Sequence, residues 1–214
     1  MIDYDQLLEL IQTRRSVRRF EDRAVAREDL RRMLEAARWA PSNHNRQPWK
    51  FLVIEDRERI RELAEVVRMG MESKVKSLPE VAAVHAAGLV HYGTFFAAAP
   101  VLIVALHKLP IAAAAALWET TQHPELVSGE PLSVAMAMQN LLLAAHALGL
   151  GTCVMTAPLL ADNLAEALPV PPGFAITSLI AVGHPEGNSP PPRRKSLAQI
   201  VDFDRNSQPT GGPP

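Results

Sequence analysis

Residues 14–20 read RRSVRRF and residues 41–49 read PSNHNRQPW, and these two segments are the most informative part of the chain. The first packs four arginines and one serine into seven residues. A guanidinium group is planar and always charged, and it can bind a phosphate through two parallel hydrogen bonds. The second places a serine, two asparagines and a glutamine between two prolines, before a β-rich stretch. A rigid polar loop on a strand often forms a binding site, so the pair predicts a site for a flat, phosphorylated cofactor.

Each segment also has a simpler interpretation. Cations near the end of a helix offset its dipole, so Arg14, Arg15 and Arg18 could be plain surface residues. Serine, asparagine and proline are ordinary turn residues. A turn has less use for Gln47 and Trp49, and their presence favours a binding loop.

The bulk composition is that of an ordinary globular protein. The chain has 214 residues, of which 48% are hydrophobic and 21% are charged, and this suits one domain with a sizeable core. Lys plus Arg is 22 and Asp plus Glu is 23, which argues against nucleic acid as the main partner. The longest apolar runs, 97–106 and 112–118, fall short of the roughly 20 residues of a membrane span. We therefore expect no membrane partner, and the N-terminus shows no secretory signal.

Cysteine and histidine usage narrows the chemistry further. Cys153 is the only cysteine, which excludes an intrachain disulfide and favours a reducing, cytoplasmic setting. It lies in a short apolar run, so we expect a buried structural thiol. The seven histidines form no metal-binding motif, and we expect no metal site. Only His44, inside the polar loop, is placed to contact a ligand.

Hydrophobic periodicity predicts the secondary structure. Helices are expected at 3–14, 28–38, 57–69, 81–99, 111–121, 131–148 and 160–168, and strands at 49–54, 100–106, 152–156 and 174–183. Asp3 should cap the first helix, whose buried stripe would be Leu7, Leu8 and Ile11. Trp39 and Trp49 flank the polar loop and are expected in the core.

The helix at 131–148 is the strongest in the chain. Apolar residues spread around most of its circumference, so it is either central or covered by a second subunit. Gly149 should end this helix. Gly151 is less well explained as a helix end, and it indicates a close backbone approach or an unusual turn.

A proline-rich arm begins at about residue 184 and carries the basic run Arg193, Arg194 and Lys195. On its own, such a run is most often a solvated tail. We expect a single domain over 1–206 that includes this arm, and disorder over 207–214.

In chain order, RRSVRRF, PSNHNRQPW, a long helix ending in GLGT, and GHP followed by a basic arm resemble the FMN-dependent nitroreductase superfamily. The resemblance covers nearly all of residues 10–203. It implies an α+β fold with a central, mainly antiparallel sheet flanked by helices. It also implies an intertwined homodimer with FMN at two sites in the dimer interface, and the apolar helix 131–148 would then form the dimer core.

The resemblance also implies roles for individual residues. Those that would hold the FMN phosphate, ribityl chain and ring edge are Arg14, Arg15, Ser16 and Arg18. Those that would reach the flavin from the partner subunit are Pro41, Ser42, Asn43 and Asn45. Met155 and Thr156 would lie along the flavin ring near its reactive N5, and either Arg193 or Arg194 would clamp the phosphate.

The implied reaction is a ping-pong hydride transfer. NADH or NADPH would reduce flavin N5, and a small-molecule electron acceptor such as a nitroaromatic or a quinone would then be reduced in the same cleft. The flavin performs the chemistry, so no catalytic side chain is assigned.

Two departures from the usual family pattern leave the identity of the substrate undetermined. Many members have a lysine and an asparagine where this chain has His91 to Thr94, and many have Glu-Gly where Thr156-Ala157 stand. No lid sequence of the dehalogenating branch is evident. One alternative is therefore a member that fragments flavin or oxidises heterocycles. A non-enzymatic, arginine-rich binding module is a weaker alternative, because the net charge is close to zero.

Overall fold

The apolar run after Pro100 forms the central strand β2 (Val101–Lys108), and both faces of this strand are covered. Leu102, Val104 and Leu106 enter one hydrophobic cluster, whereas the odd-numbered residues between them enter another. Side chains alternate along a strand, so a continuous apolar run requires a core on each face. The sheet is therefore the middle layer of three.

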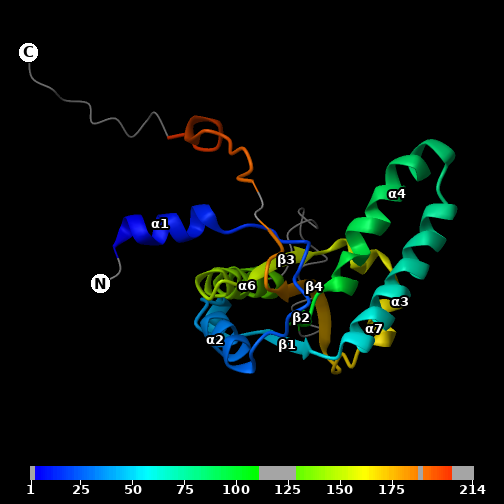
Figure 1. Cartoon of the computed structure of the whole chain (residues 1–214), viewed down its shortest axis with the longest axis horizontal. Coiled ribbons are helices and arrows are strands. Elements are labelled where there is room, and N and C mark those ends of the chain that lie inside the picture. Colours follow the sequence, from blue (N-terminus) through cyan, green and yellow to red (C-terminus); the bar gives the residue numbers. More distant parts are fainter. Residues whose placement is uncertain (1–2, 111–128, 188–189, 204–214) are drawn as a thin grey trace, which may run out of the picture.

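The sheet has four strands in the order β1-β2-β4-β3, and each neighbouring pair is antiparallel. The other three strands are β1 (Trp49–Ile54), β4 (Phe174–Gly183) and β3 (Gly151–Met155). This computed structural model describes residues 3–110, 129–187 and 190–203. Helices lie on both faces of the sheet (Figure 1), which confirms the expected α+β architecture.

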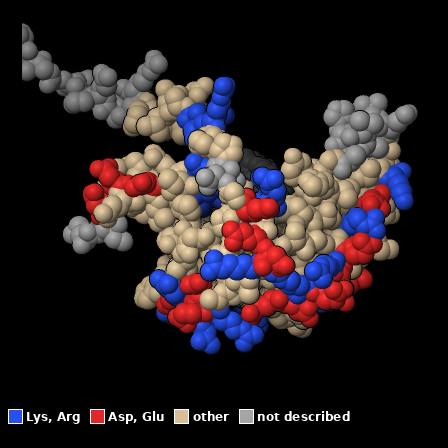
Figure 2. All heavy atoms as spheres, in the orientation of Figure 1, with Lys and Arg blue, Asp and Glu red and all other residues tan. Residues whose placement is uncertain are grey.

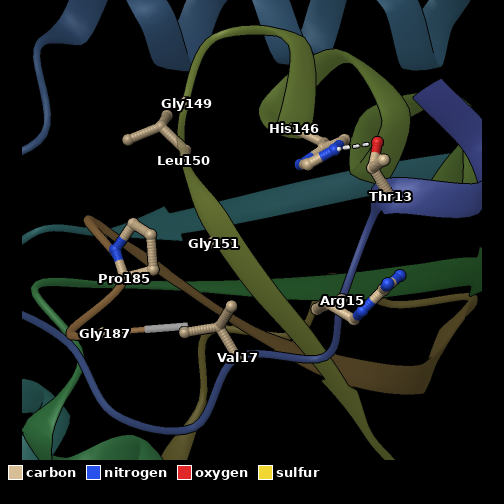
Figure 3. A pocket seen from close by; sticks show the side chains of 9 residues that line it. All are labelled: Thr13, Arg15, Val17, His146, Gly149, Leu150, Gly151, Pro185 and Gly187. Atoms are coloured by element: carbon tan, nitrogen blue, oxygen red, sulfur yellow. Dashed lines mark hydrogen bonds between the residues drawn. The ribbon is translucent and has the colours of Figure 1, made fainter. Parts of the chain in front are cut away.

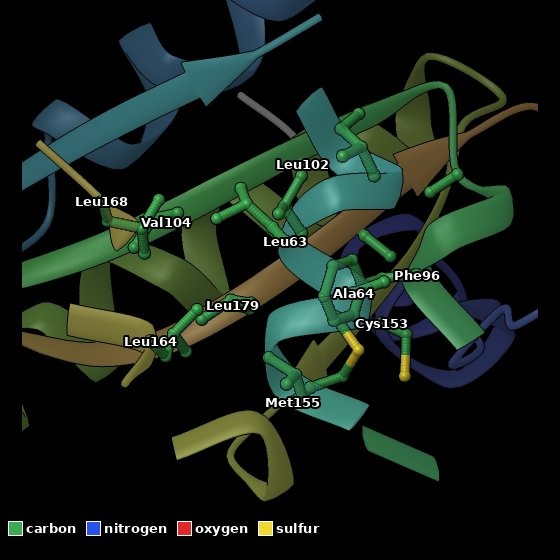
Figure 4. Close-up of a cluster of buried hydrophobic side chains, with 14 of the residues drawn as sticks. Leu63, Ala64, Phe96, Leu102, Val104, Cys153, Met155, Leu164, Leu168 and Leu179 are labelled. Atoms are coloured by element: carbon green, nitrogen blue, oxygen red, sulfur yellow. The ribbon is translucent and has the colours of Figure 1, made fainter. Parts of the chain in front are cut away.

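One face of the sheet is covered by α3 (Arg57–Lys76) and the short α7 (Leu164–Ala167). Figure 4 shows their leucines meeting strand residues and Phe96 in a single cluster. Phe96 belongs to a 3-10 turn, Phe95–Ala98, and another such turn, Ala157–Leu160, lies close to α3.

Helix α4 (Glu80–Thr94) packs on α3, and the two form a hairpin that extends past the sheet (Figure 1). Asp56 caps the hairpin's first helix, because its Oδ1 accepts the amide hydrogens of Glu58 at 2.9 Å and Arg59 at 3.3 Å. The start of α3 is thus stabilised by a side-chain cap, and the buried residues of the helix pack on the sheet.

The other face is covered by α2 (Arg27–Arg38) and α6 (Gly129–Ala147), which pack on each other. Gly149 has a φ of +74°, and the amide of Leu150 donates to the carbonyl of Ala145 at 2.9 Å. This left-handed glycine closes the helix as predicted.

Helix α1 (Tyr4–Thr13) differs from its prediction. Leu7 and Ile11 are 45% and 44% exposed, and no residue of α1 is buried. In Figure 1 the helix runs outward from the body, and the described residues leave Leu7 and Ile11 exposed, although the C-terminal end of the helix contacts α6. The predicted capping was also wrong, because Asp3 stands at the N-cap but its side chain makes no capping hydrogen bond.

Several boundaries also moved. Strands β1 and β4 have the predicted bounds, whereas the helix expected at 81–99 ends at Thr94 and the one expected at 160–168 contains only α7. Trp39 was wrongly placed in the core: it is 74% exposed, and its indole N–H donates to Glu35 at 2.9 Å. The helix predicted at 111–121 and the tail at 207–214 lie outside the described residues.

Candidate functional site

The arginine-rich segment lies along the outer edge of the sheet. Ser16 forms a parallel bridge with Thr152 of β3, and the Val17 amide donates to the Thr152 carbonyl at 2.9 Å. Four residues later, Phe20 bridges Pro185 at the start of the arm. The segment is therefore extended and held at both ends, so its side chains alternate between two sides.

Two glycines let this segment lie so close to the sheet. A Cβ on Gly151 would lie 2.8–2.9 Å from three side-chain atoms of Val17, and a Cβ on Gly183 would lie 2.6 Å from Pro100 and 2.8 Å from Phe20. Real Cβ atoms essentially never approach so closely. A close backbone approach is thus the reason for Gly151.

The arginine cavity, as we call it, has a volume of about 550 Å³ and lies between this segment and the C-terminal arm. Its lining residues are Arg14, Arg15, Ser16, Arg18, Pro190, Pro192 and Arg194. Arg193 is absent from that lining, so the geometry favours Arg194 as the arm residue that meets the others. Four guanidinium groups and a hydroxyl thus surround one space.

Unlike most arginines on the helices, these have no acidic partner among the described residues. Arg68 of α3, for comparison, meets Glu72 at 2.6 Å, and blue and red alternate along the lower side of the molecule in Figure 2. The Nε atoms of Arg14 and Arg15 are buried and have no hydrogen-bond partner. Because unpaired buried donors are unfavourable, the cavity has the chemistry of an anion site.

The arginine segment also reaches the α3–α4 hairpin. The guanidinium carbon of Arg18 lies 6.0 Å from the ring centroid of Tyr92, near the end of α4. The Thr94 hydroxyl donates to the Val90 carbonyl of its own helix at 2.8 Å. The Thr94 hydroxyl is therefore committed to its own helix, and Arg18 brings a guanidinium to the last turn of α4. Tyr92 could not be predicted here, because nothing in the sequence pairs it with Arg18.

A second cavity, of about 390 Å³, is lined by Arg15 and Val17 of the same segment and by residues around the end of α6 (Figure 3). His146 Nε2 lies 2.9 Å from the Thr13 hydroxyl, which also lies 2.7 Å from the Glu9 carbonyl and donates its hydrogen there. Thr13 must then accept a hydrogen from His146 Nε2. Burial lowers the pKa of His146, and the charges of Arg14 and Arg15 lower it further, which favours the neutral ring.

The polar loop, residues 41–49, adopts an unusual backbone conformation. His44, Asn45 and Gln47 have φ of 51°, 53° and 47°, in the left-handed region that favours glycine. Ser42 Oγ accepts the Gln47 amide at 3.0 Å, and Gln47 Nε2 donates to Asn45 Oδ1 at 3.3 Å. The side chains of Asn43 and Asn45 are exposed, as are Pro41 and His44. Such side chains are available to a ligand or a partner.

The polar loop and the arginine cavity lie at opposite ends of α6. The loop contacts Gly129 and Ser133 in the first turns, whereas the segment at Thr152 lies just beyond Gly149. A helix of 19 residues is about 28 Å long at 1.5 Å per residue. Within one chain, therefore, these two sets of predicted site residues do not meet.

The remaining predicted residues lie at the end of β3. Met155 is buried in the hydrophobic cluster, so it can offer a ligand only its backbone, whereas Thr156 is exposed. Cys153 is buried as predicted, and burial raises the pKa of its thiol although Arg18 and Arg14 act in the opposite direction. This thiol is protonated at neutral pH and is a structural residue.

The sequence matches the Nitroreductase family over residues 11–184. The chain belongs to this family. Within the family, it is 29% identical over 185 residues to an Archaeoglobus fulgidus protein provisionally named NADH dehydrogenase/NAD(P)H nitroreductase, and the match covers 85% of this chain and 87% of that protein. It is 31% identical to the iodotyrosine deiodinase of Haliscomenobacter hydrossis over 193 residues, which covers 88% and 84% of the two chains.

Solved structures agree with this family assignment. A nitroreductase-type protein from Desulfovibrio desulfuricans, solved in complex with FMN, superposes with a TM-score of 0.67 at 27% identity, covering 95% of this chain and 98% of that one. Across the described parts of this nitroreductase-family chain, no helix is long and apolar enough to cross a membrane. The same residues contain no group of three or more histidine, cysteine or acidic side chains that could hold a metal ion.

Proposed function

We propose that this chain binds FMN with its phosphate in the arginine cavity and uses NADH or NADPH to reduce a flat electrophile such as a nitroaromatic or a quinone. The observation that carries the proposal is the group of guanidiniums without acidic partners, two of them with buried, unbonded Nε atoms. A phosphate in the cavity would accept charge-assisted hydrogen bonds from the guanidinium N–H groups that line it. The FMN complex of the D. desulfuricans relative supports the choice of anion.

The proposed site residues divide into two groups. Arg14, Arg15, Ser16, Arg18 and Arg194 would hold the phosphate, the ribityl chain and the ring edge from one chain. Arg193, outside the cavity, would contribute less. Thr156 and the backbone of Met155 would lie along the ring.

The second group, on the polar loop, requires a homodimer. These residues, Pro41, Ser42, Asn43 and Asn45, lie at the first turns of α6, whereas the cavity lies beyond its other end. The helix between them is about 28 Å long, which is too far for the two sets to share one flavin in the same chain. Leu132 and Met136 leave an exposed apolar stripe on that helix. If two copies pack these stripes in antiparallel fashion, the loop of each chain comes to the arginine cavity of the other. A monomer that retains FMN with full affinity would refute this arrangement.

When bound, FMN supplies hydride transfer between the nicotinamide and the acceptor. The chain's own residues would bind and orient it. Because Thr94 is committed to its own helix, Arg18 would supply the positive charge that stabilises reduced flavin at this end of the site. One cleft would serve both substrates, hence ping-pong kinetics. The reducing, cytoplasmic setting proposed from the single cysteine would supply the reduced nicotinamide.

A second candidate keeps the flavin but changes the reaction. The deiodinase relative and the Thr156-Ala157 pair, where many members have Glu-Gly, fit a member that acts on another class of substrate or on the flavin itself. Reductive removal of a halogen from a halogenated phenol is then the first reaction to test.

An absorbance spectrum of the purified protein tests both candidates. A yellow protein that bleaches on addition of NADH or NADPH without oxygen supports the reductase. A yellow protein that bleaches only with dithionite favours the second candidate. A colourless protein that also fails to bind added FMN would overturn the proposal.

A further inference from the structure

The polar loop is held in a conformation that its own sequence does not favour. Three of its residues, His44, Asn45 and Gln47, are left-handed without being glycine. Such a backbone persists only where the surroundings hold it, and it is often found where a protein presents groups to a ligand. The contacts that hold this loop therefore matter for the site.

The first turns of α6 supply the main anchor. The Asn43 amide donates to Ser133 Oγ at 3.3 Å, and Ser133 Oγ donates to the Gly129 carbonyl at 2.7 Å. Ser133 is buried, so this short chain of hydrogen bonds is shielded from water. Gly129 also lies against the Asn43 side chain, because a Cβ there would come within 3.0 Å of Asn43 Nδ2.

A charged contact fixes the other end of the same loop. Arg46 Nη1 lies 3.5 Å from Glu130 Oε1, and the Glu130 side chain is only 10% exposed. A carboxylate that is nearly buried requires a cationic partner. Lys108 of β2 lines the same cavity as Glu130, and the charge of this carboxylate acts on His107, the residue before Lys108.

We propose that Ser133 and Glu130 are positioning residues that set where Ser42, Asn43 and Asn45 are presented to flavin. The part of this inference that involves flavin rests on the proposed function. The contacts that hold the loop on α6 do not depend on it. The bonds inside the loop shape it, whereas the two bonds to α6 fix it to the body. These residues were missed by sequence reasoning, because Glu130 lies 84 positions from its partner in the loop.

The test uses the full chain with flavin removed, in the variants Ser133→Ala and Glu130→Gln. Asn140→Ala is the matched control, because Asn140 Nδ2 makes a similar bond from α6 to the Ala36 carbonyl, at 3.2 Å, but does not contact the loop. Amide hydrogen exchange of the peptide covering 42–47 reports on the anchor, and titration with FMN reports the Kd. The visible spectrum of bound FMN reports on the surroundings of the ring.

We expect Ser133→Ala to speed exchange in the loop and to raise the FMN Kd, each roughly fivefold, as for loss of one hydrogen bond. Glu130→Gln should act in the same direction, and both should shift the spectrum of bound FMN. Asn140→Ala should leave all three readouts within about twofold of the wild type while lowering stability similarly.

Each other outcome is decisive. Unchanged hydrogen exchange in both variants would show that the loop keeps its conformation without Ser133 and Glu130, which would refute their role as an anchor. Faster exchange with an unchanged Kd and spectrum would show that the loop does not reach the flavin, which overturns the positioning role. If the wild-type protein binds no FMN, the proposed function fails, and the exchange data alone still decide whether α6 holds the loop.

Discussion

Replacing Gly151 with alanine should disturb the arginine cavity without touching any arginine. The new methyl group would lie 2.8 Å from Val17 Cβ and Cγ2 and 2.9 Å from Cγ1. Ordinary van der Waals contact begins near 3.4 Å, so three contacts are each about 0.5 Å too short. Because Val17 Cβ is fixed to the backbone, no change of rotamer relieves the clash, and the segment must move away from β3.

The expected cost follows from similar overpacking in protein cores. Inserting one methyl group into a packed site costs about 1–3 kcal/mol. For a chain of this size, each kcal/mol corresponds to a fall in Tm of roughly 2–4 °C. The shift should also lengthen the 2.9 Å bond from the Val17 amide to Thr152 and displace Ser16, its neighbour. FMN affinity should therefore fall by about tenfold, beyond the loss of stability.

Thermal melting and FMN titration measure the two effects, and Gly88→Ala is the matched control. Gly88 lies in α4 with no atom within 4 Å of its would-be Cβ, so alanine there should raise stability by about 0.5–1 kcal/mol. The double variant Val17→Ala/Gly151→Ala should regain only part of the lost Tm and FMN affinity, because the side chain at position 17 keeps its Cβ. A Gly151→Ala protein with wild-type Tm and FMN affinity would refute the close approach described here.

Three further predictions concern charge and protonation. Arg194→Ala should raise the FMN Kd at least tenfold, as for loss of a charge-assisted hydrogen bond, whereas Arg193→Ala should change it about threefold or less; equal effects in an FMN titration would contradict the assignment. The pKa of His146 in the folded protein is lowered by burial and by Arg14 and Arg15. As the pH falls below about 6.5, the unfolded chain therefore binds a proton at this histidine more readily than the folded protein does. The free energy of unfolding should then decrease as the pH falls. Melting between pH 7.5 and 5 should show this slope, and His146→Gln should reduce it, with a remainder from His107, whose pKa is also lowered by burial. The pKa of Cys153 is raised by burial, so its alkylation at pH 8 should be slow in the native protein and fast in denaturant; equal rates would contradict its placement in the core.

Patterns that depend on local chemistry predicted much of the fold. The bounds of β1 and β4 were correct because each is a β-rich run ended by charged residues or glycine. The end of α6 was predicted to within one residue because Gly149 is left-handed, a conformation that few other residues tolerate. Trp39 was misplaced because hydrophobicity ignores its polar tip, which bonds Glu35 at the surface.

Contacts between distant segments could not be read from local pattern. The stripe of α1 was predicted to be buried because amphipathic spacing shows which face is apolar but not what covers it. The choice between Arg193 and Arg194 depended on the path of a proline-rich arm that has no periodicity. The left-handed residues of the polar loop are not glycines, so their residue types did not predict this conformation. The residues of α6 that hold the loop are distant in sequence, since Ser133 lies 90 positions from Asn43.

The bridge between Ser16 and Thr152 also affects the solubility of folding intermediates. Strand β3 is last in the sheet order, and an unpaired outer strand invites pairing with other chains. The arginine-rich segment covers part of that strand with a run of like charges, which repels an approaching copy. The residues proposed to bind a phosphate would therefore also oppose aggregation at this edge, as gatekeeper residues do. If the segment detached from the sheet, the edge of β3 would be free to pair with other chains, and the proposed phosphate site would lose its arginines.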